Sequence, residues 1–215
     1  MPFVAPVGTR RRCGGPSQRV PGCPRGSESH VRPYLHESPA TEEHLAMAAV
    51  KIHRHAMIGP EARLRFEITM EHALNAPTAV TTFRQHDCAP QMDGAAARVI
   101  AAEDALDRST DRPGWFRGVG LGLDSVMHQH KPDMTLLCAS TKAAEQGFSP
   151  AGTSPGGVDV AGAHDFEPTR HEDLGFAERP GGYPPLEAEV TSLGAAQPVN
   201  LSGGFTAHEE PGGAP

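Results

Sequence analysis

Aromatic residues are scarce in this sequence, at 5% of 215 residues, and the apolar fraction of 38% is also low for a chain of this length. No apolar run approaches the roughly 20 residues that cross a bilayer, and the N-terminus lacks the apolar core of a signal peptide. We therefore expect a cytoplasmic protein without a membrane span, made of one domain or one and a half. The net charge of −7 disfavours nucleic acid as the main partner.

Cysteine is also sparse, and its spacing indicates neither a zinc site nor a disulfide framework, because no CxxC pair occurs. The four cysteines are Cys13, Cys23, Cys88 and Cys138. The twelve histidines are scattered along the chain. His53 with His55, or His128 with His130, could chelate a metal as a pair, but solvated surface positions are the simpler interpretation. We expect no metal site.

Glycine and proline, by contrast, are abundant, at 24 and 21 residues. Within residues 1–37 they recur every few positions, arginine outnumbers acidic residues, and no apolar period is present. This composition predicts a disordered basic arm. Such an arm could tether an anionic surface or nucleic acid. We favour the plainer interpretation, which is a leader unrelated to the rest of the protein.

The first clear helical pattern is TEEHLAMAAVKIHRHAM at residues 41–57. Thr41 is a suitable N-cap, apolar residues repeat at helical spacing along one stripe, and Gly59 follows the pattern immediately before a proline. A second, shorter helix is expected between Thr69, as its cap, and Pro77, as its stop.

The apolar run from Ala95 to Ala102 predicts a buried strand followed by a short helix. Cys88, shortly before it, could be considered a nucleophile. No base lies beside it in sequence to lower the pKa of its thiol, so we interpret Cys88 as a small packing residue.

Residues Trp115 to Val119 predict another strand, followed by a glycine-rich turn and then a helix at residues 134–146 with Asp133 as its N-cap. Glycines occupy alternate positions in this region: Gly118, Gly120 and Gly122. They do not form a dinucleotide-binding fingerprint, because position 123 is leucine and no helix opens there.

The segment GVDVAGAHDF at residues 157–166 organises the second half of the chain. Its valines and Ala161 predict a short buried strand, at whose end lie His164 and Asp165. In α/β folds, strand ends facing a crevice are where chemistry is usually placed. A polar, glycine-rich loop, PVNLSGG, follows at residues 198–204.

Five short motifs occur in one order along the chain. They are DGAAA at 93–97, RGVG at 117–120, HDF at 164–166, EDLGF at 172–176 and VNLSGG at 199–204. In this combination the sequence resembles the C-terminal half of thiolases, in the branch of sterol-carrier-type and archaeal acetyl-CoA acetyltransferases. The resemblance implies an α/β fold with a mixed sheet flanked by helices. It covers about residues 38–215.

The resemblance also implies a domain division. Residues 38–112 correspond to the end of the N-terminal thiolase half, and residues 113–215 to a truncated C-terminal domain. Residues 1–37 match nothing in the family. The interval between the HDF and EDLGF motifs is shorter than in the family and contains Pro168, so we expect the helix there to be damaged or absent.

A thiolase, as the resemblance implies, makes or breaks a carbon–carbon bond between acyl groups carried on coenzyme A. A cysteine thiolate takes the acyl group, a histidine activates that cysteine, and oxyanion holes stabilise the negative charge that develops. The substrates would be coenzyme A thioesters, and no cofactor would be tightly bound.

The family's roles transfer to specific positions. His164 occupies an oxyanion-hole position in a box that includes Asp165 and Phe166 but lacks the family's cysteine. The loop is matched by Asn200, Ser202, Gly203 and Gly204. Glu210 stands at the family's activating histidine, where a carboxylate would oppose thiolate formation. His208 is a candidate substitute. Nothing in the sequence corresponds to the nucleophilic cysteine.

We therefore expect a thiolase-like acyl-CoA acyltransferase fragment of lipid metabolism that is inactive alone. One alternative is a non-catalytic subunit that pairs, as a homo- or hetero-oligomer, with a thiolase-like chain or with a small zinc-ribbon and OB-fold protein. Another is a retro-aldolase of the same superfamily. We also expect marginal stability, because a lone thiolase half would expose apolar surface.

Overall fold

The computed structural model describes residues 2–6, 25–90, 93–108, 110–125, 127–164 and 168–208. Its strands are β1 (Pro2–Pro6), β2 (Thr78–Val80), β3 (Phe83–Arg84) and β4 (Trp115–Gly120). Its α-helices are α1 (Arg25–Glu37), α2 (Glu42–Ala56), α3 (Met70–Asn75), α4 (Cys138–Ala151), α5 (Thr169–Asp173), α6 (Pro184–Glu187) and α7 (Gly204–His208). The 3-10 turns are η1 (Gln85–Asp87), η2 (Glu103–Arg108), η3 (His128–His130) and η4 (Pro155–Gly157). Among these helices, none has the length and apolarity that a membrane crossing requires.

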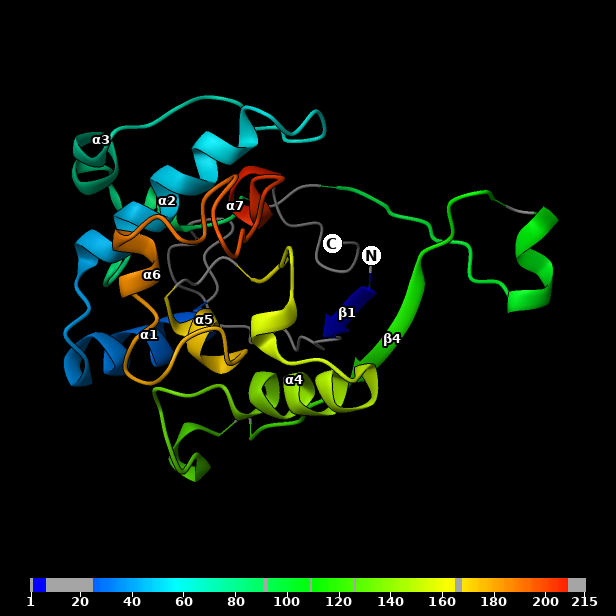
Figure 1. The fold of residues 1–215 in the computed structure, drawn as a ribbon. Coiled ribbons are helices and arrows are strands. Elements are labelled where there is room, and N and C mark those ends of the chain that lie inside the picture. Colours follow the sequence, from blue (N-terminus) through cyan, green and yellow to red (C-terminus); the bar gives the residue numbers. More distant parts are fainter. Residues whose placement is uncertain are drawn as a thin grey trace.

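The described strands form small sheets rather than one large one. β1 and β4 pair in parallel, β2 and β3 pair antiparallel, and a single parallel bridge joins Ala161 to Val199. Parallel and antiparallel pairings are thus both present, and Figure 1 shows α4 beside β1 and β4. The strand predicted at residues 157–166 is reduced to that bridge, with Val160 41% exposed.

Helix α4 packs directly on one face of β4 and its continuation. A side chain at Gly118, Gly120 or Gly122 would overlap a backbone carbonyl oxygen of α4. Because alternate residues of a strand face the same side, these three glycines let the helix approach the strand backbone closely. The sequence had placed two of them in a turn; the strand instead continues to Gly120.

The opposite face of this strand is apolar and uncovered. Val119, Leu121 and Leu123 alternate with the glycines and are 61%, 54% and 73% exposed.

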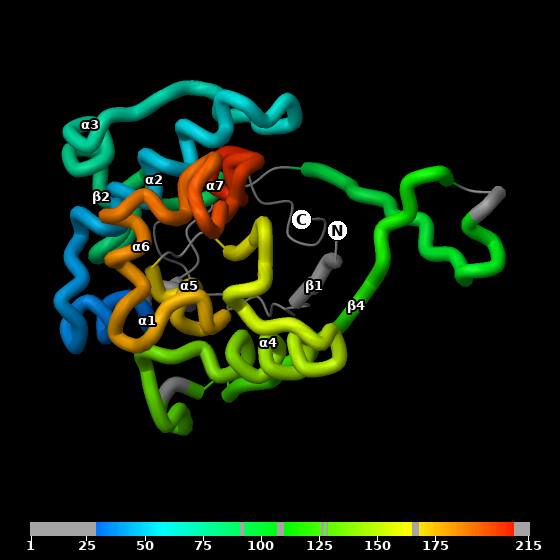
Figure 2. The backbone as a smooth tube through the Cα atoms, viewed as in Figure 1, coloured from blue at the N-terminus to red at the C-terminus, as the bar shows by residue number. Residues whose placement is uncertain are grey.

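In Figures 1 and 2, β4 leads away from the body to an excursion formed by the preceding residues. Residues 93–102 there are exposed and lack regular structure, with Val99 94% exposed, so the predicted buried strand at 95–102 is wrong. No strand within the described ranges pairs with them to cover their apolar side chains.

Helix α2 is the centre of the body. It confirms the helix predicted at 41–57, with Thr41 as its N-cap residue, but ten of its 15 residues are buried, so burial extends beyond one apolar stripe. Leu45 packs with Val31 and Phe83, and Ile52 packs with Ala207. Helix α3 also matches the prediction: the Thr69 hydroxyl accepts a hydrogen bond from the His72 backbone N–H at 3.1 Å.

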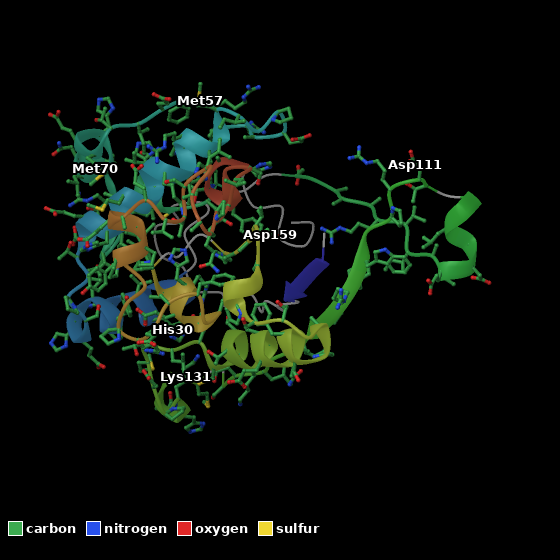
Figure 3. All side chains as sticks on the ribbon, in the orientation of Figure 1. His30, Met57, Met70, Asp111, Lys131 and Asp159 are labelled. Atoms are coloured by element: carbon green, nitrogen blue, oxygen red, sulfur yellow. The ribbon has the colours of Figure 1, made fainter. Side chains whose placement is uncertain are left out.

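Residues 25–37 form helix α1, which corrects the prediction of a disordered arm through residue 37. Val31 and Tyr34 are both 2% exposed, and the Tyr34 hydroxyl donates to Glu172 Oε1 of α5 at 2.5 Å. His30 Nδ1 donates to the Met134 carbonyl at 3.0 Å, and the side chains of His30 and Lys131 meet in the region labelled in Figure 3. Buried partners on the C-terminal side of the chain therefore order a segment whose own composition favours disorder. Residues 1 and 7–24 of the predicted arm lie outside the described residues, and residues 2–6 form strand β1.

Helix α4 begins and ends later than predicted. Asp133 does not cap it; the Asp133 carboxylate accepts from the Thr135 backbone N–H at 2.7 Å and holds a turn before the helix. Gly147 lies inside α4, and Gly152, with φ of 64°, is its C-cap. After the HDF motif, where we expected a damaged or absent helix, the structure has the five-residue helix α5, which begins directly after Pro168.

Candidate functional site

The two segments that the sequence singled out for chemistry lie side by side. The Ala161 N–H donates to the Pro198 carbonyl at 3.0 Å, and the Asn200 N–H donates to the Ala161 carbonyl at 2.9 Å. The Asn200 side chain then extends the contact, because its Oδ1 accepts from the Ala163 N–H at 2.8 Å. These bonds fix the backbone next to His164 against the 198–204 loop.

The loop requires unusual backbone conformations. Asn200 is 4% exposed and has φ of 57°, a left-handed conformation that asparagine tolerates better than most residues. Gly203 and Gly204 have φ of 103° and 53°. At Gly203 an added Cβ would also lie 2.8 Å from the Ala56 Cβ, so both the backbone conformation and the packing require glycine there.

The C-terminal end of α2 is the surface on which this loop rests. His55 Nδ1 donates to the Asn200 carbonyl at 3.1 Å, and His55 Nε2 accepts from the Leu193 N–H at 3.2 Å. An added Cβ at Gly59 would lie 2.7 Å from the Ser202 carbonyl oxygen. The loop and the helix end therefore pack backbone to backbone.

His164 is half-buried, and its ring lies 5.2 Å from the Phe205 ring, centroid to centroid, tilted by 41°. Phe205 belongs to α7, which begins in the loop itself, so the imidazole faces the end of the loop and the start of this helix. His208 closes the same helix, and its Nε2 donates to the Ser202 carbonyl at 2.8 Å. The structure thus brings together His164, the loop residues and His208.

Three other residues of the predicted site, Asp165, Phe166 and Glu210, lie outside the described residues. Cys88 is buried and disulfide-bonded, which agrees with a non-nucleophilic role but corrects the expectation of no disulfide. Cys138 is a free thiol at the first position of α4. Within the described ranges, no group of three or more His, Cys, Asp or Glu side chains is placed to hold a metal ion.

Sequence reasoning missed His55 and His53 of α2, which it interpreted as surface residues; both are 1% exposed. A signal was present for His55, because it lies three positions after Ile52 and beside Ala56, on the apolar stripe of the helix. His53 lies four positions after Ala49, which also places it beside the apolar stripe, and its ring packs on Phe66 and His86, at ring distances of 4.7 and 5.5 Å.

The pKa values of His53 and His86 are lowered, in both cases chiefly by burial. For His53 a hydrogen bond to the Phe66 carbonyl partly opposes the shift, and the nearby His86 adds to it. Burial also raises the pKa of Asp87 to about 6, against the opposing effect of its hydrogen bond from the Arg84 N–H. These groups lie on the face of α2 away from the loop contact.

The two acidic residues of the EDLGF motif make buried polar contacts that join several segments. Glu172 is buried, and its Oε1 accepts from the N–H groups of Gly181 and Gly182 at 2.9 and 2.8 Å as well as from Tyr34. Burial, together with the hydrogen bond to Glu172, strongly raises the pKa of Tyr34. Asp173 pairs with Arg170 at 2.8 Å. The motif therefore anchors α1 and the 179–182 turn to α5.

Comparison with known protein families gives a match in the C-terminal part of the chain. Residues 120–215 match the family model for "Thiolase C-terminal domain-like" proteins. This match confirms the thiolase resemblance that the order of the motifs predicted.

Individual relatives extend the match toward the N-terminus. The chain is 32% identical over 188 residues to an acetyl-CoA acetyltransferase of Methanothermobacter thermautotrophicus, covering 86% of this chain and 49% of that protein. It is 28% identical over 191 residues to sterol carrier protein 2 of Gallus gallus, covering 80% of this chain and 33% of that one. The chain thus spans half or less of the length of these relatives.

The fold is thiolase-like as well. A solved structure titled "Ltp2-ChsH2(DUF35) aldolase" superimposes with a TM-score of 0.73 at 22% identity, over 83% of this chain and 49% of that one. This likeness concerns the fold. It confirms the α/β, thiolase-like class expected from the sequence.

Proposed function

We propose that this chain is a thiolase-like acyl-CoA acyltransferase fragment whose substrate-facing residues are His164 and the Asn200–Gly204 loop. The observation that carries the proposal is the hydrogen bond between the Asn200 side chain and the Ala163 N–H at 2.8 Å, which joins the two segments. Segments 37 residues apart in sequence become one rigid unit at the end of the 161–199 bridge. The family match over residues 120–215 supports the same assignment.

In this proposal the fragment holds the oxyanion side of the reaction. The His164 imidazole would donate a hydrogen bond to the oxygen on which negative charge develops. The loop would keep that imidazole in place through Ala163. The acyl group would arrive as a coenzyme A thioester, the substrate class implied by the name of the Methanothermobacter relative. No tightly bound cofactor forms part of the proposal.

In this proposal, neither Cys88 nor Cys138 supplies the nucleophilic thiolate. The Cys88 sulfur forms a disulfide bond. Cys138 lies on α4, which packs on β4. Glu210 at the activating position would disfavour a thiolate by like-charge repulsion. His208 is the candidate substitute base, but its Nε2 donates to the Ser202 carbonyl, leaving Nδ1 as the nitrogen that could take a proton. We therefore propose that the chain alone does not complete acyl transfer.

The test separates binding from turnover. Saturation-transfer NMR with acetyl-CoA should detect binding, and Asn200→Ala should weaken it. Incubation with acetoacetyl-CoA and coenzyme A should give no thiolysis above the uncatalysed rate. Absence of acetyl-CoA binding would refute the substrate class. Thiolysis would refute the proposed inactivity, and a His208→Ala variant would then test the substitute base.

A second function, as a non-catalytic subunit, is favoured by the uncovered apolar face of β4. Val119, Leu121 and Leu123 lie on that face, and the extended, exposed residues 93–102 precede the strand. A contiguous apolar surface of this kind is typical of an interface. The partner would be a thiolase-like chain, or a zinc-ribbon and OB-fold protein. In either case the complex, and not this chain alone, would be the active unit.

The coding DNA on both sides of this gene distinguishes the two functions. A separate intact reading frame that encodes the cysteine-bearing thiolase half would favour the subunit, and the two products should then form a complex in size-exclusion chromatography. Cysteine motifs in other frames beside this gene would indicate a broken copy. Including a β-hydroxyacyl-CoA in the assay tests the retro-aldolase alternative, whose products would be a ketone or aldehyde and a shorter thioester.

A further inference from the structure

We propose that His55 is a positioning residue for the candidate site: it fixes the Asn200 carbonyl and, through Asn200, the backbone that carries His164. The proposal rests on the proposed function, because it assigns His55 to that site. The candidate site would thereby include a residue of α2, a helix that lies outside the 120–215 segment matched by the family model.

Two backbone partners of His55 indicate its tautomer. The Asn200 carbonyl can only accept a hydrogen bond, so Nδ1 carries the proton. The Leu193 backbone N–H can only donate, so Nε2 carries the lone pair. With 1% of its surface exposed, the ring is a buried bridge between the 189–194 turn and the loop.

The bridge acts on a residue in the left-handed backbone conformation. Asn200 has φ of 57°, and in that conformation its carbonyl faces His55 while its side-chain Oδ1 receives the Ala163 N–H. Moving the carbonyl would therefore also move Oδ1. Close packing beside it, between Gly203 and Ala56, leaves the loop little room to adjust. A change at position 55 is thus transmitted to position 163.

His53 provides a matched control two positions earlier. It is as buried as His55, lies on the same helix and also hydrogen-bonds a backbone carbonyl, that of Phe66 at 3.1 Å. Its ring contacts Phe66 and His86 and not the loop. Replacing it therefore perturbs α2 to a similar extent without removing a contact to Asn200.

The experiment compares His55→Asn, His55→Gln and His53→Ala in the full chain. An asparagine amide can replace the Nδ1 donor to Asn200, whereas the longer glutamine side chain places its oxygen where Nε2 accepts from Leu193. Amide hydrogen exchange is measured by NMR at Ala163 and Leu193, after circular dichroism has shown native helix content. The ring proton shifts of His164, which depend on the position of Phe205, are followed in the same samples.

We expect His55→Gln to accelerate exchange at Ala163 by about tenfold or more, as losing one buried hydrogen bond implies, and to shift the His164 signals. His55→Asn should restore Ala163 protection and the His164 shifts while Leu193 exchanges faster. His53→Ala should leave Ala163 protected. Equal loosening of Ala163 in all three variants, or protection in His55→Gln, would overturn the inference.

Acetyl-CoA binding by the same variants separates this inference from the proposed function. Weaker binding by His55→Gln, with rescue in His55→Asn, supports both. If the wild-type chain does not bind acetyl-CoA, the proposed function fails, while the exchange rates at Ala163 still decide whether His55 positions Asn200.

Discussion

The region around α2 and the region around β4 are built in opposite ways. At the C-terminal end of α2, polar side chains and small residues meet distant backbone at close range, and His53, His55 and Asn200 are all buried. At β4, one face is closed by α4, and the other presents exposed valine and leucine side chains. The first region is complete by itself, whereas the second has the composition of a surface that another layer covers.

The largest loss of stability is expected at the face of β4 that helix α4 covers. Replacing Gly120 with valine forces a side chain into the α4 backbone, so the free energy of unfolding should fall by about 3 kcal/mol or more, the upper range for overpacking. Urea denaturation followed by circular dichroism measures it. Val119→Thr on the exposed face is the control and should change stability by less than about 0.5 kcal/mol. Equal effects of the two variants would show that the faces of β4 do not differ.

A smaller loss is expected at the anchor of α1. Tyr34→Phe removes the hydroxyl that donates to buried Glu172, which should lower the free energy of unfolding by about 1–3 kcal/mol. The exposed His36 on the same helix gives the control, His36→Ala, with little change. If Tyr34→Phe were as stable as the wild type, α1 would not be part of the folded body.

The uncovered face should control association more than stability. Replacing Leu121 and Leu123 with serine removes exposed apolar area, so self-association measured by light scattering should decrease while the unfolding midpoint stays nearly unchanged. The wild-type chain should melt broadly, because one side of its β4 layer lacks a cover. A sharp, cooperative melt of a monomer would contradict the interpretation of this face as an interface.

The smallest expected effect is a pH dependence of stability, caused by titratable groups on the other side of α2. The pKa values of His53 and His86 in the folded chain lie below the usual 6.5. At a pH between each lowered pKa and 6.5, the unfolded chain therefore binds more protons than the folded chain. Their contribution to stability is therefore complete above pH 6.5 and is lost as the pH falls through the lowered pKa values. Asp87, with its pKa raised to about 6, acts in the opposite direction, because its ionisation above about 4 costs stability.

Urea midpoints between pH 7 and 5 measure this balance. His53→Phe keeps the aromatic contact and should make stability depend less on pH, whereas Asp87→Asn should make the acid loss steeper. A pH profile of His53→Phe that matches the wild-type profile would contradict the assignment to His53.

Local patterns predicted the elements whose caps and apolar spacing lie within their own segment. The Thr69 cap of α3 and the helix from 42 to 56 follow from capping and helical spacing. The predicted strand at 95–102 failed, since an apolar run becomes a strand only when another strand pairs with it. Helix α1 was missed for the converse reason: distant Glu172 and Met134 supply the partners that its own sequence lacks.

The sequence by itself determined the family, the motif order and which residues are candidates for chemistry, because these depend on residue identity and spacing. Only the tertiary structure decided that Asn200 holds Ala163 and is itself held by His55, 145 residues away. It also decided that the alternating glycines at β4 face a helix while the alternating apolar residues are exposed. Both outcomes follow from chain packing, which pairs donors with acceptors and backbone with backbone across distances that no local pattern encodes.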